Sequence, residues 1–268
     1  MRLKVRYETR YDYSPPVRDG ITALRLRPVS RPGLNVIESS LAASPGAISA
    51  SHLDGWGTAV DIVECPGTHA AIEFALDAVV ETVAPEKPEK LSSFQCIRYL
   101  EETSRVRFSA IESLGWGLVE SSWTAVESVL AWIPQRFVYE VGATDAATPI
   151  ETVIRQGAGV CQDFAHIFLS ILRCWGYHAR YVSGYFFNTT PDAEAISAEA
   201  MHAWVEVYRP EFGWVGLDAT TGAYADDRYV VVGYGRDYDD VRPIRGVIRG
   251  GATAQTHFAR LQMVQQQQ

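Results

Sequence analysis

The sequence predicts an α+β protein in two parts, because strand-like segments come first, helical segments follow and strand-like segments then return. Between residues 1 and 80, short alternating runs are separated by clusters of proline, glycine and serine, a spacing typical of a β-sandwich. From residue 91 apolar residues recur at helical spacing, and from residue 179 the strand period returns. We therefore expect an N-terminal β-sandwich-like domain followed by helices packed on an antiparallel sheet.

A charged stretch with two prolines separates the two parts. It is VAPEKPEK, residues 83–90, and it has the composition of a linker. We expect an N-terminal β-rich domain over residues 1–85, the core domain over 90–245, and a C-terminal strand and tail over 246–268.

Four helical segments are predicted, at residues 91–104, 121–140, 148–156 and 161–175. In the second, Thr124 and Glu127 have the spacing of a capping box, and Pro134 should kink or end the helix. The third is expected to close at Gly157, and the fourth to stop at Gly176.

Composition and charge exclude several classes of protein. The 268 residues are 47% apolar and carry a formal net charge of −8, which argues against a nucleic-acid partner. No segment reaches the roughly 20 apolar residues of a membrane span, and the N-terminus lacks the apolar run of a signal peptide. The four cysteines lack close spacing and suggest free thiols in a reducing interior. We expect a cytoplasmic protein that does not bind membranes.

Cys161 stands in the segment QGAGVCQDFAH (residues 156–166), where two glycines precede the start of a strongly apolar helix. Unpaired N–H groups and the helix dipole favour a thiolate over a thiol at such a helix N-terminus. The glycines allow backbone turns that a side chain would block, and they leave room for a substrate. A nucleophilic cysteine accounts for this arrangement; a buried structural cysteine is the alternative, and the commoner case for a single cysteine.

A nucleophilic thiol needs a base, and the base needs an orienting group. His202 begins one predicted strand and Asp218 ends the next, and the segment PEFG between them predicts a hairpin turn. Pairing about a turn centred between residues 211 and 212 would set His202 opposite about residue 221, so we expect a bulge or a register offset to bring the two side chains together. Cys161, His202 and Asp218 then form a candidate triad on a helix and two paired strands.

Other combinations of ligand-type residues are less consistent with a site. A zinc ion bound by Cys161, His166, Cys174 and His178 is excluded, because Cys161 and Cys174 would lie about 20 Å apart along one helix and on different faces. His166 lies about 140° round the helix from Cys161, which excludes it as the base and favours a role in the core. The acidic run DYDDV at 237–241 is typical of a solvated loop, with calcium as a minor alternative.

Three longer segments contain the candidate residues or follow them: GVCQDFAHIFLSILRCWGYHARYVSGY, HAWVEVYRPEFGWVGLDATTG and GRDYDDVRP. They resemble the core of the bacterial transglutaminase-like family, within the papain-like thiol enzyme superfamily. The N-terminal segments YDYSPPVRDGITALRLRP and HLDGWGTAVDIVE are similar to the β-rich domain that often precedes that core. The resemblance covers about residues 1 to 250. It implies a papain-like catalytic core over 90–245 with Cys161 as nucleophile, His202 as base and Asp218 as orienting residue.

The sequence departs from the family pattern near the triad. Met201 stands before His202, where the family often has a small residue. Residues 219–221, Ala-Thr-Thr, follow Asp218 where the family usually has Pro-Thr-Asn, and His178 replaces a common proline. The first two changes add bulk or remove rigidity beside the triad.

The resemblance implies a thiol-dependent acyl-transfer enzyme acting on amide bonds of a protein or peptide substrate, as a cysteine protease or amidase or as a protein-glutamine transglutaminase or deamidase. The thiolate of Cys161 attacks the carbonyl, His202 protonates the departing nitrogen, and water or an amine resolves the thioester. The Cys161 backbone N–H and Tyr139 are the candidate oxyanion donors, and no metal or organic cofactor is required. The alternative is a catalytically silent module that holds peptides in the same cleft.

Overall fold

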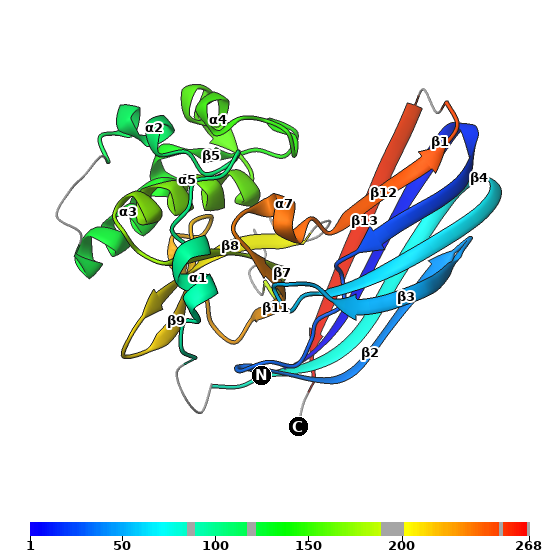
Figure 1. Cartoon of the computed structure of the whole chain (residues 1–268), viewed down its shortest axis with the longest axis horizontal. Coiled ribbons are helices and arrows are strands. Elements are labelled where there is room, and N and C mark those ends of the chain that lie inside the picture. The colour runs from blue at the N-terminus through cyan, green and yellow to red at the C-terminus, as the bar shows by residue number, and fades with distance from the viewer. Residues whose placement is uncertain (85–88, 117–121, 189–200, 252–253, 267–268) are drawn as a thin grey trace.

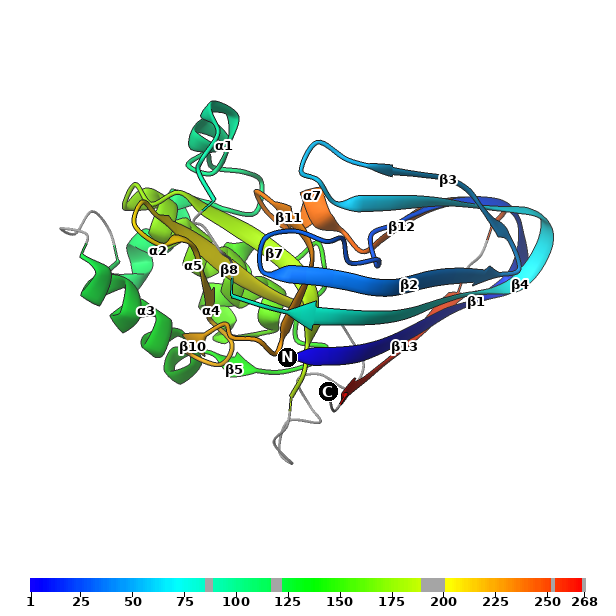
Figure 2. The ribbon, with the colours of Figure 1, turned by 90° about the horizontal axis from the view of Figure 1, so that it is seen from below.

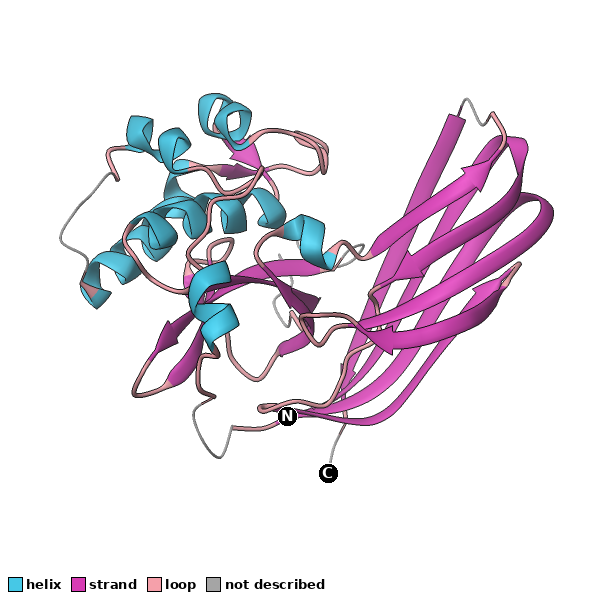
Figure 3. Cartoon of the chain, in the orientation of Figure 1, coloured by secondary structure: helices cyan, strands magenta, loops and turns pink. Residues whose placement is uncertain are grey.

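The computed structural model describes residues 1–84, 89–116, 122–188, 201–251 and 254–266. Strands alone fill one half of the molecule, and all the helices in these ranges gather in the other half (Figures 1 and 3). The main sheet of each half is antiparallel, so the α+β class predicted from the sequence is confirmed. None of the helices in these ranges is long and apolar enough to cross a membrane.

Two long antiparallel strands, β1 (Arg2–Leu24) and β4 (Ala59–Thr82), form the centre of the N-terminal domain. Four shorter strands flank them: β2 (Leu34–Ser44), β3 (Ala47–Leu53), β12 (Ile244–Arg249) and β13 (Ala254–Gln265). The first half of β1 pairs with β13 and its second half with β12. The first half of β4 pairs with β3 and its second half with β2. Both long strands bend, so that one continuous sheet folds into two layers (Figure 2).

The side-chain pattern of β1 explains why the sheet folds over. Leu3 and Val5 from its first half and Leu24 from its second half are buried in a single apolar cluster. Figure 2 shows that β1 bends between its two halves, which brings their inner side chains toward the same cluster. The register of β1 against β4 shifts between Asp12 and Val17, and such an irregularity bends a strand. The sandwich-like arrangement expected from the sequence is thus made from one folded sheet.

The closing strand expected in the tail is β13, which runs along β1 from the pair Leu3 and Gln265 to the pair Ser14 and Ala254. Strand β12 pairs with the second half of β1. The N-terminal domain therefore takes two of its strands from the last part of the chain, and the segments expected as 1–85 and 246–268 lie in one sheet.

The other half contains a second sheet and the helices. Its strands are β7 (Ala179–Phe186), β8 (His202–Arg209), β9 (Gly213–Asp218), β10 (Ala223–Tyr224) and β11 (Tyr229–Gly235), in the order β10-β9-β8-β7-β11. Its helices are α1 (Ser93–Arg98), α2 (Phe108–Ile111), α3 (Trp123–Arg136), α4 (Ile150–Gln156), α5 (Cys161–Cys174) and α7 (Tyr238–Val241), with a 3₁₀ turn at Glu112–Leu114. A parallel two-stranded ladder joins β5 (Val138–Tyr139) to β6 (Ala158–Gly159).

Helix α5 lies against β7 and β8 and forms the centre of this core (Figure 1). Every residue from Asp163 to Arg173 is buried. Its buried residues include a polar stripe, Asp163, His166, Ser170 and Arg173, as well as its apolar side chains, so α5 is covered on all sides. Its first turn, which carries Cys161, is therefore held by the packed core.

The N-terminus of α3 differs from the prediction. Ser122 caps this helix, because its hydroxyl accepts the backbone N–H of Ala125 at 3.2 Å. The predicted capping box of Thr124 and Glu127 is therefore wrong, since Thr124 already lies in the first helical turn. Pro134 lies inside α3, which ends two residues later at Arg136, consistent with a proline that ends a helix.

The two halves share buried apolar contacts. Tyr185, Val230 and Val232 of the core sheet belong to the same cluster as the inner residues of the sandwich. The Tyr185 hydroxyl donates to the backbone carbonyl of Leu26 at 2.8 Å. The sandwich is therefore packed directly against β7 and β11.

Candidate active site

Cys161 is the first residue of α5, and its side chain is half-buried. The preceding residue, Val160, donates its backbone N–H to Oδ2 of Asp163 at 2.9 Å. The same oxygen accepts the Thr144 hydroxyl at 2.5 Å. Burial raises the pKa of Asp163, while these two hydrogen bonds oppose the rise. Asp163 thus fixes the turn into a helix N-terminus, where a thiolate is favoured.

The two glycines before Cys161 are required for different reasons, Gly157 by the backbone and Gly159 by packing. Gly157 has a φ of 73°, in the left-handed region, and ends α4. At Gly159, an added Cβ would lie 2.8 Å from Oδ2 of Asp163 and 3.1 Å from Cγ1 of Val153. The expectation that the glycines leave room for a substrate is therefore wrong at Gly159, because Asp163 fills that space.

His202 and Asp218 are joined by a hydrogen bond of 2.9 Å between Nε2 and Oδ2. His202 is the first residue of β8 and Asp218 the last of β9, and both are buried. The two strands pair without a register shift and end with Val205 opposite Leu217. The two residues are therefore diagonal neighbours on one face, a spacing that an imidazole and a carboxylate can bridge. Continued to the strand ends, this register sets His202 opposite residue 220 instead of 221, so the predicted register offset is confirmed as a shift of one residue, without a bulge between the paired residues.

The contacts of the His202–Asp218 pair favour its charged form. Burial alone would lower the pKa of His202, but the charge and hydrogen bond of Asp218, together with Cys161, raise it to about 10. Burial raises the pKa of Asp218. Its interaction with His202 and the hydrogen bonds from Thr220 N–H and Tyr229 OH lower that pKa by more than burial raises it. The net pKa of Asp218 lies below its ordinary value. We therefore expect an imidazolium beside a carboxylate.

Cys161 and His202 are neighbours. The sulfur of Cys161 lies close enough to His202 to contribute to the raised pKa of its imidazole. Nε2 is bonded to Asp218, which leaves Nδ1 for the thiol. Nδ1 is buried and has no partner within ordinary hydrogen-bond geometry in the described part of the chain. The thiol–imidazole contact is therefore longer or less well aligned than a full hydrogen bond, as is common in a catalytic pair without substrate.

Tyr139 is brought next to the turn before Cys161 by the β5–β6 ladder. It lies opposite Gly159, and Glu140 N–H donates to the carbonyl of Gly159 at 2.9 Å. Burial raises the pKa of Tyr139, and the charge of Cys161 and a hydrogen bond to it add to the rise. The structure thus brings together all four residues singled out from the sequence: Cys161, His202, Asp218 and Tyr139.

Two protein-family models match this chain. Residues 117–219 match the transglutaminase-like superfamily, and residues 3–81 match the bacterial transglutaminase-like N-terminal region. The chain combines a transglutaminase-like core with a bacterial transglutaminase-like N-terminal region. The resemblance stated from the sequence is confirmed.

Several known proteins are similar over different lengths. An uncharacterised protein of Mycobacterium leprae is 29% identical over 270 residues, which span 94% of this chain and 95% of that protein. A protein-glutamine gamma-glutamyltransferase of Pseudomonas aeruginosa is 29% identical over 104 residues, 35% of this chain and 16% of that protein. The crystal structure of a candidate cysteine protease from Cytophaga hutchinsonii shares the fold, with a TM-score of 0.77 and 20% identity over 100% of this chain and 92% of the other.

Two hydrogen-bond donors to Asp218 in the transglutaminase-like core were not predicted from the sequence. The Tyr229 hydroxyl donates to Oδ2 of Asp218 at 2.8 Å. The Thr220 backbone N–H donates to Oδ1 at 2.8 Å. The Thr220 contact is a local turn of the kind aspartate often makes, and it could have been anticipated. No spacing in the sequence predicts the Tyr229 contact, because it depends on the position of β11 within the core sheet.

His166 is a core residue of the transglutaminase-like domain, as the sequence indicated. Its Nε2 accepts the backbone N–H of Tyr238 at 3.2 Å. Burial lowers the pKa of His166 to about 3, so the ring is neutral. Cys174 lies at the opposite end of α5 from Cys161. Within the described ranges, His, Cys, Asp and Glu side chains do not form a group suited to a metal ion.

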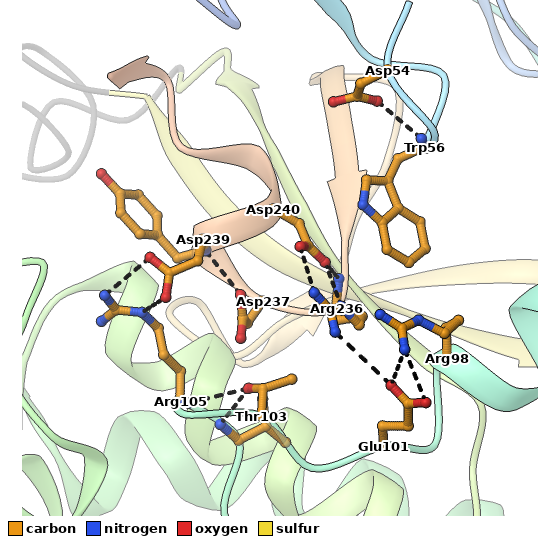
Figure 4. A network of polar contacts seen from close by, with 12 residues as sticks. Asp54, Trp56, Arg98, Glu101, Thr103, Arg105, Arg236, Asp237, Asp239 and Asp240 are labelled. Carbon is orange, nitrogen blue, oxygen red and sulfur yellow. Dashed lines mark hydrogen bonds and ion pairs between the residues drawn. The ribbon is translucent and has the colours of Figure 1, made fainter. Parts of the chain in front are cut away.

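The acidic run at α7 is tied to the rest of the core by ion pairs (Figure 4). Asp239 pairs with Arg105 at 2.8 Å, and Asp240 pairs with Arg236 at 2.8 Å. Asp237 accepts the backbone N–H of Asp239 and so caps the helix. The interpretation of this segment as a solvated loop is wrong, because its carboxylates bind arginines and its own backbone.

Proposed function

We propose that the protein is a thiol-dependent acyl-transfer enzyme acting on amide bonds of proteins or peptides. The observation that carries the proposal is the buried His202–Asp218 hydrogen bond beside the helix start that bears Cys161. In this proposal Cys161 is the nucleophile, His202 the general acid and base, and Asp218 the orienting group. The match to the transglutaminase-like superfamily supports the reaction class.

The first step transfers the acyl group to sulfur. The Cys161 thiolate attacks the amide carbonyl carbon, and the C–N bond breaks as His202 gives a proton to the departing nitrogen. The products are a thioester and free amine or ammonia. In the second step His202 takes a proton from water or an amine, which attacks the thioester and releases the thiolate. The imidazolium that remains restores the starting ion pair.

The tetrahedral intermediate requires donors for its oxyanion. The Cys161 backbone N–H belongs to the first turn of α5, where N–H groups have no partner within the helix. The Tyr139 hydroxyl is beside the same sulfur and is the second donor in the proposal. Removing one such donor typically costs about 3 kcal/mol of transition-state stabilisation.

The acceptor decides between hydrolysis and cross-linking, since both proceed through the same thioester. The name of the Pseudomonas relative supports an amine acceptor, and that of the Cytophaga structure supports water. A catalytically silent peptide-binding module is the second candidate. The charged and buried His202–Asp218 pair weighs against it, because peptide binding alone gives no reason to bury this pair beside a thiol.

Site-resolved alkylation tests the nucleophile. Iodoacetamide at neutral pH should label Cys161 fastest in the native protein, and Cys161→Ala should lose that fast phase and all turnover. Cys174→Ala is the matched control, because it removes a half-buried thiol from the other end of the same helix. Fast labelling of Cys65, Cys96 or Cys174 with a slow Cys161 would overturn the assignment.

The acceptor is found by measuring two products side by side. Native protein and Cys161→Ala are incubated with glutamine-containing proteins and peptides and a fluorescent primary amine. Amine incorporation with ammonia release indicates transamidation, ammonia alone indicates deamidation, and new peptide ends indicate proteolysis. If Cys161 is alkylated rapidly but none of these products appears across a broad panel, the binding-module alternative gains support.

A further inference from the structure

We propose that Tyr229 is a positioning residue for the His202–Asp218 pair and that the N-terminal domain holds it in place. This inference rests on the proposed function and adds a residue and a role for the N-terminal domain to it.

Asp218 is fully buried and receives three hydrogen bonds. Oδ2 accepts both His202 Nε2–H at 2.9 Å and the Tyr229 hydroxyl at 2.8 Å. Oδ1 accepts the Thr220 backbone N–H at 2.8 Å. Tyr229 and His202 both donate to Oδ2 of Asp218. The phenol therefore fixes the orientation of the carboxylate, and the carboxylate in turn fixes the orientation of the imidazole. A Tyr229 hydroxyl also stabilises the ionised carboxylate and lowers the pKa of Asp218.

Aromatic side chains keep Tyr229 in this position. Its ring centroid lies 4.4 Å from that of Phe186 and 5.2 Å from that of Trp204. Phe186 and Trp204 also pack beside His202, with centroids 5.4 and 6.2 Å away. The rings of Tyr229, Phe186 and Trp204 form a wall behind the His202–Asp218 pair. Such a wall limits access of water to the carboxylate and strengthens its interaction with the imidazole.

Strand β11 carries Tyr229 and contacts the N-terminal domain with its alternate residues. Val230 and Val232 are buried in the apolar cluster of the sandwich, while Tyr229 belongs to the aromatic cluster of the core sheet. Thr82 at the end of β4 donates its hydroxyl to the backbone carbonyl of Asp227 at 2.7 Å. Arg31 donates to the carbonyl of Val232 at 3.2 Å. The sandwich therefore contacts both β11 and the segment that precedes Tyr229.

The first test compares Tyr229→Phe with Tyr234→Phe. Each substitution removes one hydroxyl from β11 and keeps the ring, and Tyr234 packs against Arg31 instead of Asp218. The readout is the rate of Cys161 alkylation by iodoacetamide as a function of pH, resolved by mass spectrometry. The acid limb reports formation of the Cys161 thiolate beside the His202 imidazolium. Without the phenol the carboxylate no longer holds that imidazolium in place, so the acid limb of the Tyr229→Phe profile should move up by about one pH unit. The Tyr234→Phe profile should match that of the native protein.

The second test examines the N-terminal domain with a conservative pair. Thr82→Val removes the hydroxyl that reaches Asp227, and Thr9→Val removes a buried hydroxyl that binds His257 within the sandwich. Thr82→Val should shift the same acid limb in the same direction by a smaller amount. Thr9→Val should leave it in place. This pair also keeps the proposal testable if Tyr229→Phe fails to fold.

The outcomes separate this inference from the proposed function. A native profile in Tyr229→Phe, with Cys161 still the fast thiol, would overturn the role of Tyr229 and leave the triad standing. Equal shifts in Thr82→Val and Thr9→Val, or no shift in either, would overturn the role of the N-terminal domain. If native Cys161 titrates like an ordinary thiol, the proposed function fails first.

Discussion

His202 and Asp218 meet as diagonal neighbours across the β8–β9 hairpin, with their side chains joined by a hydrogen bond of 2.9 Å. The hairpin register places both side chains on one face of the sheet. A slip of one residue would turn His202 to the other face and separate the pair. The short turn after Arg209, which pairs with Gly213, therefore sets the geometry of the candidate site as well as the fold.

Asp218→Asn should remove most of the charge that holds His202 as an imidazolium. Burial then dominates, so the pKa of His202 should fall from about 10 to below its ordinary value of 6.5. We expect turnover to drop by about 10²- to 10⁴-fold, the usual range for losing general acid–base function. The pH profile of Cys161 alkylation should change with it. Asp226→Asn, at an exposed carboxylate paired with Arg228, is the control and should behave like the native protein.

Tyr139→Phe should separate oxyanion binding from thiol activation. Turnover should fall by about 10²- to 10³-fold, as for loss of one oxyanion donor. Alkylation of Cys161 by iodoacetamide forms no oxyanion, so its rate should stay within about twofold of native if Tyr139 acts only on the oxyanion. An equal loss in both measurements would mean that Tyr139 acts on the sulfur instead.

Gly159→Ala should disturb the turn before Cys161. The new methyl would meet the carboxylate of Asp163 at 2.8 Å, and overpacking of this kind costs about 1–3 kcal/mol. Urea unfolding measures the loss of stability. Gly55→Ala is the matched control, because an added Cβ there meets no atom within 4 Å. Equal stabilities for the two variants would show that the Asp163 contact relaxes without cost.

His166 should make the protein less stable in acid. Its pKa falls from 6.5 to about 3 on folding, so the unfolded chain binds a proton that the folded protein rejects between these values. Stability from the neutral ring is fully present above pH 6.5 and is lost as the pH falls toward 3, by at most about 1.4 kcal/mol per pH unit. His166→Gln should flatten this dependence in urea unfolding between pH 7 and pH 5, whereas His52→Gln, at an exposed histidine, should not.

Local signals in the sequence were sufficient to locate Cys161 and the hairpin that carries His202 and Asp218. The glycines, the apolar helix and the PEFG turn are short-range features, and each is where the sequence indicated. The helix cap of α3 shows the limit of such signals. Ser122 and Thr124 both suit a cap, and the choice depends on where the backbone leaves the helical conformation.

Contacts between distant segments could not be predicted from a single sequence. Tyr229 reaches Asp218 only because β11 pairs with β7 at the edge of the core sheet. The sandwich folds over because residues from both halves of β1 share one core, and alternation alone does not indicate a bend. The local period of a strand sets which side chains share a face, but not which strand lies beside it.

The pairing of β1 with β13 has a consequence for biosynthesis. Strand β1 leaves the ribosome long before its partner β13, so one edge of β1 is open while the transglutaminase-like core is being translated. Open strand edges recruit other chains, and contacts between such distant residues form slowly. Newly made chains should therefore be most prone to aggregate before β13 emerges, and a chaperone that shields strand edges would matter most in that interval.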